Sequence, residues 1–133
     1  GFNKIILDKL FHIIKSKCAI DLFYEFDIQK YFFPAHAFGT VMGRANYGKY
    51  FIIGQNCTVG NNHGLYPSFG DGVIMRPNSM VLGKCVIGDN VQIAAGSLVI
   101  DKDIPDNTIV FGRTPDLIIK NNNNDNIRMN FDL

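Results

Sequence analysis

The sequence lacks the features that mark several large classes of protein. Its 133 residues contain no basic run or basic face of the kind that binds nucleic acid, and the formal net charge is only +1. No apolar run approaches the roughly 20 residues that a membrane-spanning helix requires. The first residues also lack the long apolar segment and small-residue cleavage site of a secretory signal. We therefore expect one cytoplasmic domain without nucleic-acid partners or a membrane span.

Cysteine and histidine are both scarce, with three of each. Cys18, Cys57 and Cys85 do not have metal-ligand spacing, and their odd number argues against a disulfide framework. Two of them occupy small positions of the repeat described below, where a buried thiol packs well, so we expect free thiols. No glycine-rich phosphate loop of the P-loop or dinucleotide type occurs.

A period of six residues organises the chain from Phe69 to Ile104. The six blocks read FGDGVI, MRPNSM, VLGKCV, IGDNVQ, IAAGSL and VIDKDI; the first position is always apolar, and the fifth is small or β-branched in five of them. Neither a helix nor a single strand has this period. Short strands joined by tight turns do, so the pattern predicts the stacked coils of a β-helix.

The same frame continues upstream of this run. It gives Val59, Ile53, Tyr47, Val41 and Ala35 as first positions. A phase offset at residues 65–68 predicts a loop between coils. At three blocks per coil, residues 35–104 should form between three and four coils.

The flanking segments have other patterns. Apolar residues at helical spacing predict a short amphipathic helix over residues 3–17, laid against the start of the stack, and residues up to 34 should cap the open coil end. Residues 105–120 should form closing strands. The polar tail, residues 121–133, begins with an asparagine run that is not expected to bury itself. Its last residues, IRMNFDL, either dock on a neighbour or fray.

The hexads resemble those of the hexapeptide acyltransferases, which implies an all-β fold, the left-handed parallel β-helix, with a short N-terminal helical segment. The left hand comes from this resemblance alone, since parallel crossovers are otherwise right-handed. The stretch HAFGTVMG, which begins at His36, is similar to the His-Ala-Thr-Gly-Ile-Val-Val-Gly stretch of serine O-acetyltransferases. In both, the histidine takes the second hexad position. The resemblance also implies a homotrimer with sites between subunits.

The resemblance gives His36 the role of general base. An acceptor hydroxyl has to lose its proton as it attacks a thioester carbonyl, and an imidazole, with an ordinary pKa of about 6.5, suits that transfer. Acetyl-CoA is the implied co-substrate, and no metal is required. Because the first hexad position points into the coil, the second should point outward, where an imidazole can meet substrate.

A carboxylate on the far ring nitrogen would orient the imidazole. In the family it belongs to an Asp-Ile pair fifteen residues before the histidine. The pair Asp27-Ile28 matches by type but lies only nine residues upstream, whereas Asp21 has the spacing and is followed by Leu22. We favour Asp27, and Asp21 and Glu25 stay open.

At the positions that hold the acceptor in serine O-acetyltransferases, this sequence has different residues. Their second histidine lies in an Arg-His-Pro stretch whose counterpart is Leu65-Tyr66-Pro67, and their aspartate before the base is Ala35 here. These replacements remove charges that hold a zwitterion. A hydroxyl or amine of a sugar or nucleotide-sugar, as in the surface-polysaccharide branch, is therefore expected ahead of serine, with serine O-acetylation in cysteine biosynthesis as the alternative. Tyr66 and His63 are the candidate acceptor contacts.

The resemblance also suggests where the coenzyme binds. In the family its pantetheine arm follows small residues near hexad corners, and the matching positions are Pro77, Asn78, Ala94 and Ala95. Lys120 is the first candidate for the coenzyme phosphates, and Lys102 and Arg113 are weaker ones.

Two other classes of function were compared with this one. A non-catalytic β-helix scaffold or binding module would leave His36 without a role. A hexapeptide-fold carbonic anhydrase needs three metal-binding histidines, and it ranks low because only His36 and His63 lie in the coils, with His12 outside.

Overall fold

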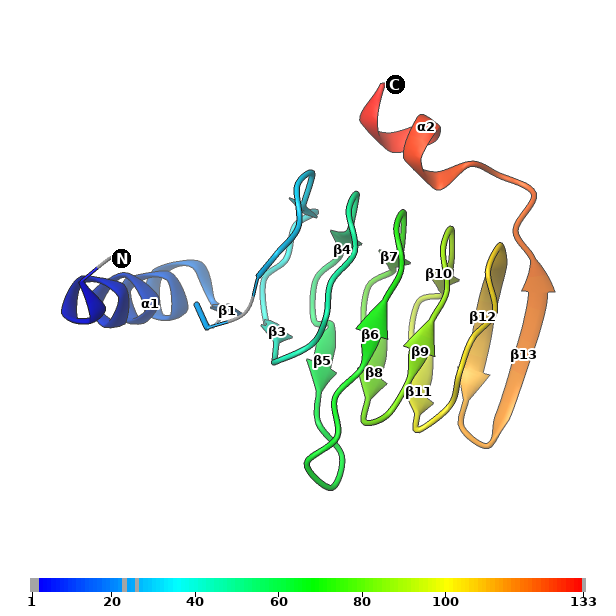
Figure 1. The fold of residues 1–133 in the computed structure, drawn as a ribbon, viewed down its shortest axis with the longest axis horizontal. Helices are drawn as coiled ribbons and strands as arrows, with labels where there is room; N and C mark the ends of the chain where they lie inside the picture. Colours follow the sequence, from blue (N-terminus) through cyan, green and yellow to red (C-terminus); the bar gives the residue numbers. More distant parts are fainter. Residues whose placement is uncertain (1–2, 23, 26, 133) are drawn as a thin grey trace.

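The chain winds into a three-sided parallel β-helix, described by a computed structural model for residues 3–22, 24–25 and 27–132 (Figure 1). Face A stacks five strands in parallel: β1 (Ile20–Leu22), β3 (Thr40–Met42), β5 (Thr58–Gly60), β8 (Met80–Leu82) and β11 (Leu98–Ile100). Face B stacks β2 (Phe33–Pro34), β4 (Ile52–Ile53), β7 (Ile74–Met75) and β10 (Gln92–Ile93). Face C pairs β6 (Ser68–Phe69) with β9 (Val86–Ile87), and single bridges at Asn46 and Ile104 extend it.

Three rows of tight turns join the faces. The B–A corner comprises residues 54–56, 76–78 and 94–96, and the A–C corner comprises residues 43–45, 61–66, 83–85 and 101–103. The C–B corner comprises residues 48–50, 70–72, 88–90 and 105–107. Asn78 (φ 61°) and Asn90 (φ 55°) hold left-handed backbone at two of these rows. Asparagine tolerates this conformation better than most residues with a side chain, which explains its frequency at the corners.

Identical hexad positions stack inside the prism. Val59, Val81 and Val99 lie above one another on face A, and all three are fully buried. On face B, Met75 and Ile93 form a similar ladder. Fully burying side chains of this size stabilises a fold by about 1.5–3 kcal/mol each. The hexad prediction is confirmed for the run that begins at Phe69.

The upstream frame is wrong by one residue before Ala45. Val41 is exposed and Ala35 is only half-buried, whereas Thr40 and Met42 are buried. Met42 pairs with Val59, one residue closer in sequence than three full hexads. The turn after Met42 is one residue short, which shifts β3 by one position. In β2 the shift has the opposite sign, because Pro34 pairs with Ile53, one residue further apart in sequence than three full hexads. No internal signal in the sequence marks either change.

Parallel pairing also begins earlier than the expected start at Ala35. Strand β1 pairs with β3, with Ile20 opposite Thr40, so the ladder reaches into the segment that was expected to form a cap. Face A is therefore five strands deep, more than the three to four coils expected. The first turn of chain is longer than three hexads, which hides it from a search for period six.

The loop lies slightly before the expected residues 65–68. Ser68 is already part of β6, and a bridge between Asn62 and Leu65 closes a tight turn. Its tip holds His63 (φ 49°) and Gly64 (φ 77°) in left-handed conformations. Figure 1 shows this loop projecting from the stack between β5 and β6, with the coils on either side intact.

An antiparallel hairpin closes the far end of the stack. It consists of β12 (Thr108–Arg113) and β13 (Asp116–Asn121). Closing strands were expected within residues 105–120, and the hairpin extends one residue beyond that range. Strand β12 pairs with β10 on face B and, through Arg113, with β11 on face A. It bends round the B–A corner and covers the last strand of each of the two faces, β10 and β11.

The N-terminal helix forms as predicted, but its apolar residues are not packed into a core. Helix α1 (Lys4–Cys18) is capped by the Asn3 side chain, which accepts from the Ile5 N–H at 2.9 Å, and none of its described residues is buried. Ile5, Ile6 and Ile13 are all more than half exposed. Figure 1 shows α1 beyond the first coil, running away from the stack. It meets the coil end through polar contacts, an ion pair of Lys15 with Asp21 and a hydrogen bond from the Tyr24 hydroxyl to Asp8, and across an apolar cavity of about 320 Å³ lined in part by Leu7 and Leu22.

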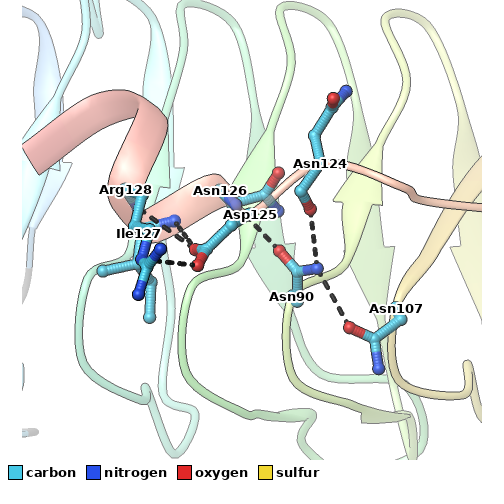
Figure 2. Close-up of polar contacts among 7 residues, drawn as sticks. All are labelled: Asn90, Asn107, Asn124, Asp125, Asn126, Ile127 and Arg128. Carbon is cyan, nitrogen blue, oxygen red and sulfur yellow. Dashed lines mark hydrogen bonds and ion pairs between the residues drawn. The ribbon is translucent and has the colours of Figure 1, made fainter.

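The polar tail behaves in the opposite way. Asn122 and Asn126 are 5% and 1% exposed, so the expectation that this run cannot bury itself is wrong. The short helix α2 (Asn126–Phe131) lies along the C–B corner, and Phe131 stacks edge-on against Tyr50. Figure 2 shows the Asn90 side chain bonded to Asn107, to the Asn124 carbonyl and to the Asn126 N–H. Hydrogen bonds to the corner replace those the amides would make with water.

The thiols are free, and their surroundings differ. Cys57 and Cys85 are buried, as expected for fifth hexad positions, while Cys18 is exposed at the end of α1. Burial raises the pKa of the Cys85 thiol. Among the described residues, neither helix is long and apolar enough to cross a bilayer.

Candidate functional site

His36 lies two residues after β2, where the first coil turns from face B to face A. Its backbone is left-handed (φ 52°) and its side chain is exposed. The Phe38 N–H donates to the His36 carbonyl at 2.8 Å. The equivalent turn of the next coil stacks on this one, and its Asn56 N–H donates to the Phe38 carbonyl.

The side chain is exposed, as expected, but not at the second hexad position. The Ala35 N–H donates to the Ile53 carbonyl as the Gly54 N–H donates to the Met75 carbonyl, so Ala35 takes that position and His36 the next one.

The imidazole borders a small cavity of about 150 Å³. Strands β4 and β7 supply its floor through Ile52, Ile74 and Met75, and its wall comes from Gln55, Arg76 and Pro77 of the B–A corner. Pockets that take drug-sized ligands occupy roughly 300–1,000 Å³. The cavity is therefore suited to a small acceptor beside His36.

The coenzyme candidates lie along the same corner. Pro77 lines the cavity with His36, and Asn78 follows it in the turn. The Gly96 N–H donates to the Pro77 carbonyl at 3.1 Å, which stacks the turn containing Ala94 and Ala95 directly on this one. These residues form one continuous edge that begins at His36.

The basic candidates are more scattered. Lys120 lies on β13 with its ammonium 5.6 Å from the centroid of the Phe111 ring. Lys102 lies at the A–C corner, where it lines a cavity with Lys84, Asp101 and Asp103. Lys120 lies opposite Ile109 of β12, on face B, whereas Arg113 lies in β12 itself and pairs with Leu98 of face A.

Arg76 is a cavity residue that the sequence reasoning missed. Its Nε and Nη2 donate to the Gln92 Oε1 at 3.4 and 3.1 Å, and no acid pairs with it in the described part of the chain. It takes the second position of its hexad, which is expected to point outward, and that position was the available signal in the sequence.

The structure does not bring the three candidate acids to His36. Within the described ranges, no hydrogen bond or ion pair joins any of them to the imidazole. Asp27 lines a cavity of about 360 Å³ at the A–C corner, together with Glu25 and Arg44. Arg44 Nη2 and Glu25 Oε2 are 3.6 Å apart. The role given to Asp27 stays a prediction.

Asp21 has a different location. It lies in β1, and its carboxylate pairs with Lys15 of α1 at 2.6 Å. The Gly39 N–H donates to the carbonyl of Ala19 at 2.7 Å, so the chain leading into β1 runs beside the turn that carries His36. Asp21 itself pairs with Val41 of β3, two residues after Gly39, so it lies just beyond that turn.

The acceptor candidates His63 and Tyr66 lie at the A–C corner, outside the His36 cavity. His63 is exposed at the loop tip. The Arg44 guanidinium lies 5.7 Å from the centroid of the Tyr66 ring. Contact of either residue with the acceptor of His36 would require a neighbouring subunit.

Metal chemistry has no evident site. No group of three His, Cys, Asp or Glu side chains suited to a metal occurs among the residues that the structure describes. His12 on α1, His36 at the B–A corner and His63 on the loop belong to three separate parts of the chain.

Comparisons with known proteins identify the repeat and its relatives. Residues 66–101 match the family described as bacterial transferase hexapeptide (six repeats). A serine acetyltransferase from Synechococcus elongatus is 35% identical over 85 residues, which cover 60% of this chain and 34% of that protein.

Solved serine acetyltransferases share the fold. Isoform 3 from Entamoeba histolytica, in complex with cysteine, is 31% identical with a TM-score of 0.68, covering 86% of this chain and 42% of that one. A serine acetyltransferase in complex with CoA has a TM-score of 0.76 at 22% identity, covering 88% and 48%. The chain spans less than half the length of each of these relatives. The left-handed β-helix and the resemblance to hexapeptide-repeat acyltransferases of the serine acetyltransferase type are confirmed.

Proposed function

We propose that this hexapeptide-repeat chain, similar to serine acetyltransferases along its coils, moves an acetyl group from acetyl-CoA to the hydroxyl of serine. The observation that carries the proposal is the position of His36, which borders a small cavity at the start of the B–A corner. The resemblance gives that corner to the coenzyme and that histidine to the base. The coenzyme corner and His36 lie along one continuous edge, in a fold that this chain shares with serine acetyltransferases.

His36 takes the proton of the serine hydroxyl as the oxygen attacks the thioester carbonyl. The new C–O bond forms, the C–S bond breaks, and the imidazolium returns the proton to the departing thiolate. The products are O-acetylserine and CoA. Positioned base catalysis of this kind is typically worth about 10²- to 10⁴-fold in rate.

Serine replaces the sugar that the sequence favoured. That preference rested on Leu65, Tyr66 and Ala35, which stand where serine enzymes carry charged or basic residues. The named relatives and solved structures are serine acetyltransferases, and they support the amino acid as acceptor. The loss of family charges then has to be compensated by other residues of this chain.

The coenzyme and the assembly follow from the same relatives. Acetyl-CoA is the donor, with its pantetheine arm along Pro77, Asn78, Ala94 and Ala95 and its phosphates near Lys120. A homotrimer would bring the A–C corner of one copy, with Tyr66 and His63, to the His36 cavity of its neighbour. Asp27 or Asp21 would orient the imidazole.

The test is an acceptor comparison with purified protein and acetyl-CoA. Thiol release is followed with serine and with nucleotide-linked amino sugars, and mass spectrometry identifies the product. We expect O-acetylserine at the highest turnover. Turnover on an amino sugar with none on serine would refute the proposed acceptor, and no turnover on any acceptor would favour a binding module.

A further inference from the structure

The cavity beside His36 contains one cation whose charge is not cancelled. Arg76 lines it, none of the other lining residues is acidic, and no acid pairs with Arg76 in the described ranges of the chain. A lone guanidinium in a small cavity attracts a ligand that carries a carboxylate or phosphate, because Arg binds such oxygens in bidentate fashion.

A neutral side chain fixes the direction of this guanidinium. Gln92 Oε1 accepts from both Nε and Nη2 of Arg76, at 3.4 and 3.1 Å. A carboxylate in this position would hold Arg76 equally well but would neutralise it. An amide oxygen orients the guanidinium and leaves its positive charge, and its remaining N–H donors, available to a ligand.

The C-terminal tail in turn fixes the amide of Gln92. Gln92 Nε2 donates to Asn126 Oδ1 at 2.8 Å, so its Oε1 has to face Arg76. Asn126 is fully buried, and its own amide is set by donation from Nδ2 to the Gly72 carbonyl at 2.9 Å. Asn122 Nδ2 also donates to Asn126 Oδ1, at 3.1 Å. Three amides therefore connect the tail to the cavity.

We propose that Arg76 binds the α-carboxylate of the acceptor amino acid, and that Gln92 and Asn126 are positioning residues that present it. This inference rests on the proposed function and names how that site recognises serine. Arg76 supplies the cation that Leu65 fails to provide at the family's position. Arg76 and His36 both line this cavity, so an acceptor that reaches both would present its carboxylate to the guanidinium and its hydroxyl to the imidazole. The tail then becomes part of the acceptor site.

The experiment compares serine with ethanolamine, which is serine without its carboxylate. Arg76→Ala should raise the KM for serine by about 10- to 100-fold, as expected for a lost charge-assisted bond, and should leave the KM for acetyl-CoA unchanged. The preference for serine over ethanolamine should fall by a similar factor. Arg128→Ala, on the exposed side of the tail, is the matched control and should change none of these values.

Gln92→Glu tests the role of the neutral amide. Its carboxylate would pair with Arg76, so the KM for serine should rise at least as much as in Gln92→Ala, with the KM for acetyl-CoA unchanged. Asn126→Ala should raise the KM for serine by about 2- to 10-fold, whereas Asn123→Ala, an exposed neighbour, should not. Calorimetric titration with serine alone should rank the serine affinities of these variants in the same order, without any turnover.

The outcomes separate this inference from the proposed function. Wild-type protein that does not acetylate serine would refute the function itself. Wild-type turnover on serine, with serine KM and ethanolamine discrimination unaltered in Arg76→Ala, would refute only the inference. A rise in the KM for acetyl-CoA instead of serine would assign Arg76 to the coenzyme phosphates and would also overturn it.

Discussion

The two ends of the chain reverse what their compositions suggest. Helix α1 carries isoleucines and leucine at helical spacing, yet none of its described residues is buried. The tail that begins with four asparagines contributes two of the six buried polar residues in the described part of the chain, Asn122 and Asn126. The difference lies in what each end meets. Apolar α1 extends past the coil end, while the tail follows a corner rich in backbone carbonyls that amides can satisfy.

The largest loss of stability is expected from a substitution at Asn126. Its side chain accepts from Gln92 and Asn122 and donates to the Gly72 carbonyl. Asn126→Ala therefore leaves two buried polar groups and the half-buried Gln92 amide without this partner. We expect a loss of about 2–3 kcal/mol in the free energy of unfolding. Urea denaturation followed by circular dichroism measures it.

The matched control is Asn123→Ala. Asn123 is exposed and belongs to the same asparagine run, so its replacement should change the free energy of unfolding by less than about 0.5 kcal/mol. Equal effects at the two positions would mean that the run acts by composition and not through its contacts with the corner.

A smaller effect is expected at the cap of α2. The Asp125 side chain accepts from the N–H groups of Ile127 and Arg128 at 3.0 and 3.1 Å. Asp125→Ala should cost about 1 kcal/mol, the usual value for a lost N-cap, and Asp125→Asn should recover most of it. Proteolysis within residues 126–131 should become faster in the alanine variant. An unchanged cleavage rate would show that contacts such as those of Asn126 and Phe131 hold the helix without its cap.

The smallest effect is expected on the exposed side of α1. Ile13 is 56% exposed, so Ile13→Ser should change the free energy of unfolding by less than about 0.5 kcal/mol in dilute monomer. Chemical denaturation at two protein concentrations measures it. A cost above about 1.5 kcal/mol that grows with concentration would show that α1 is buried against another copy.

These ends show why periodicity predicted the middle of the chain better than its flanks. In the run from Phe69 to Ile104 each coil repeats the same three turns, so one side chain per block has to be apolar and the fold follows from the pattern. Ile87 and Ile93 are buried as their hexad positions require. At Met42 a single shortened turn shifted the frame, and a change of one residue leaves the apolar content unaltered.

The candidate site was predicted in part. The sequence indicated an outward His36 and, separately, a coenzyme position at Pro77; in the structure both residues line one cavity, although the hexad frame around His36 was wrong. The link of Arg76 to the tail could not be anticipated, because Gln92 and Asn126 are brought together by a chain reversal at the β12–β13 hairpin. The position of Asp27 also depends on how the irregular first coil folds, which no repeat specifies.

The central claim is that His36 carries the proton in acetyl transfer to serine, and His36→Ala tests it most directly. We predict a fall in kcat of about 10²- to 10⁴-fold, with calorimetric affinity for CoA retained and with His12→Ala, a variant of the α1 histidine, fully active. Acetyl transfer to serine at an undiminished rate in His36→Ala would contradict the account.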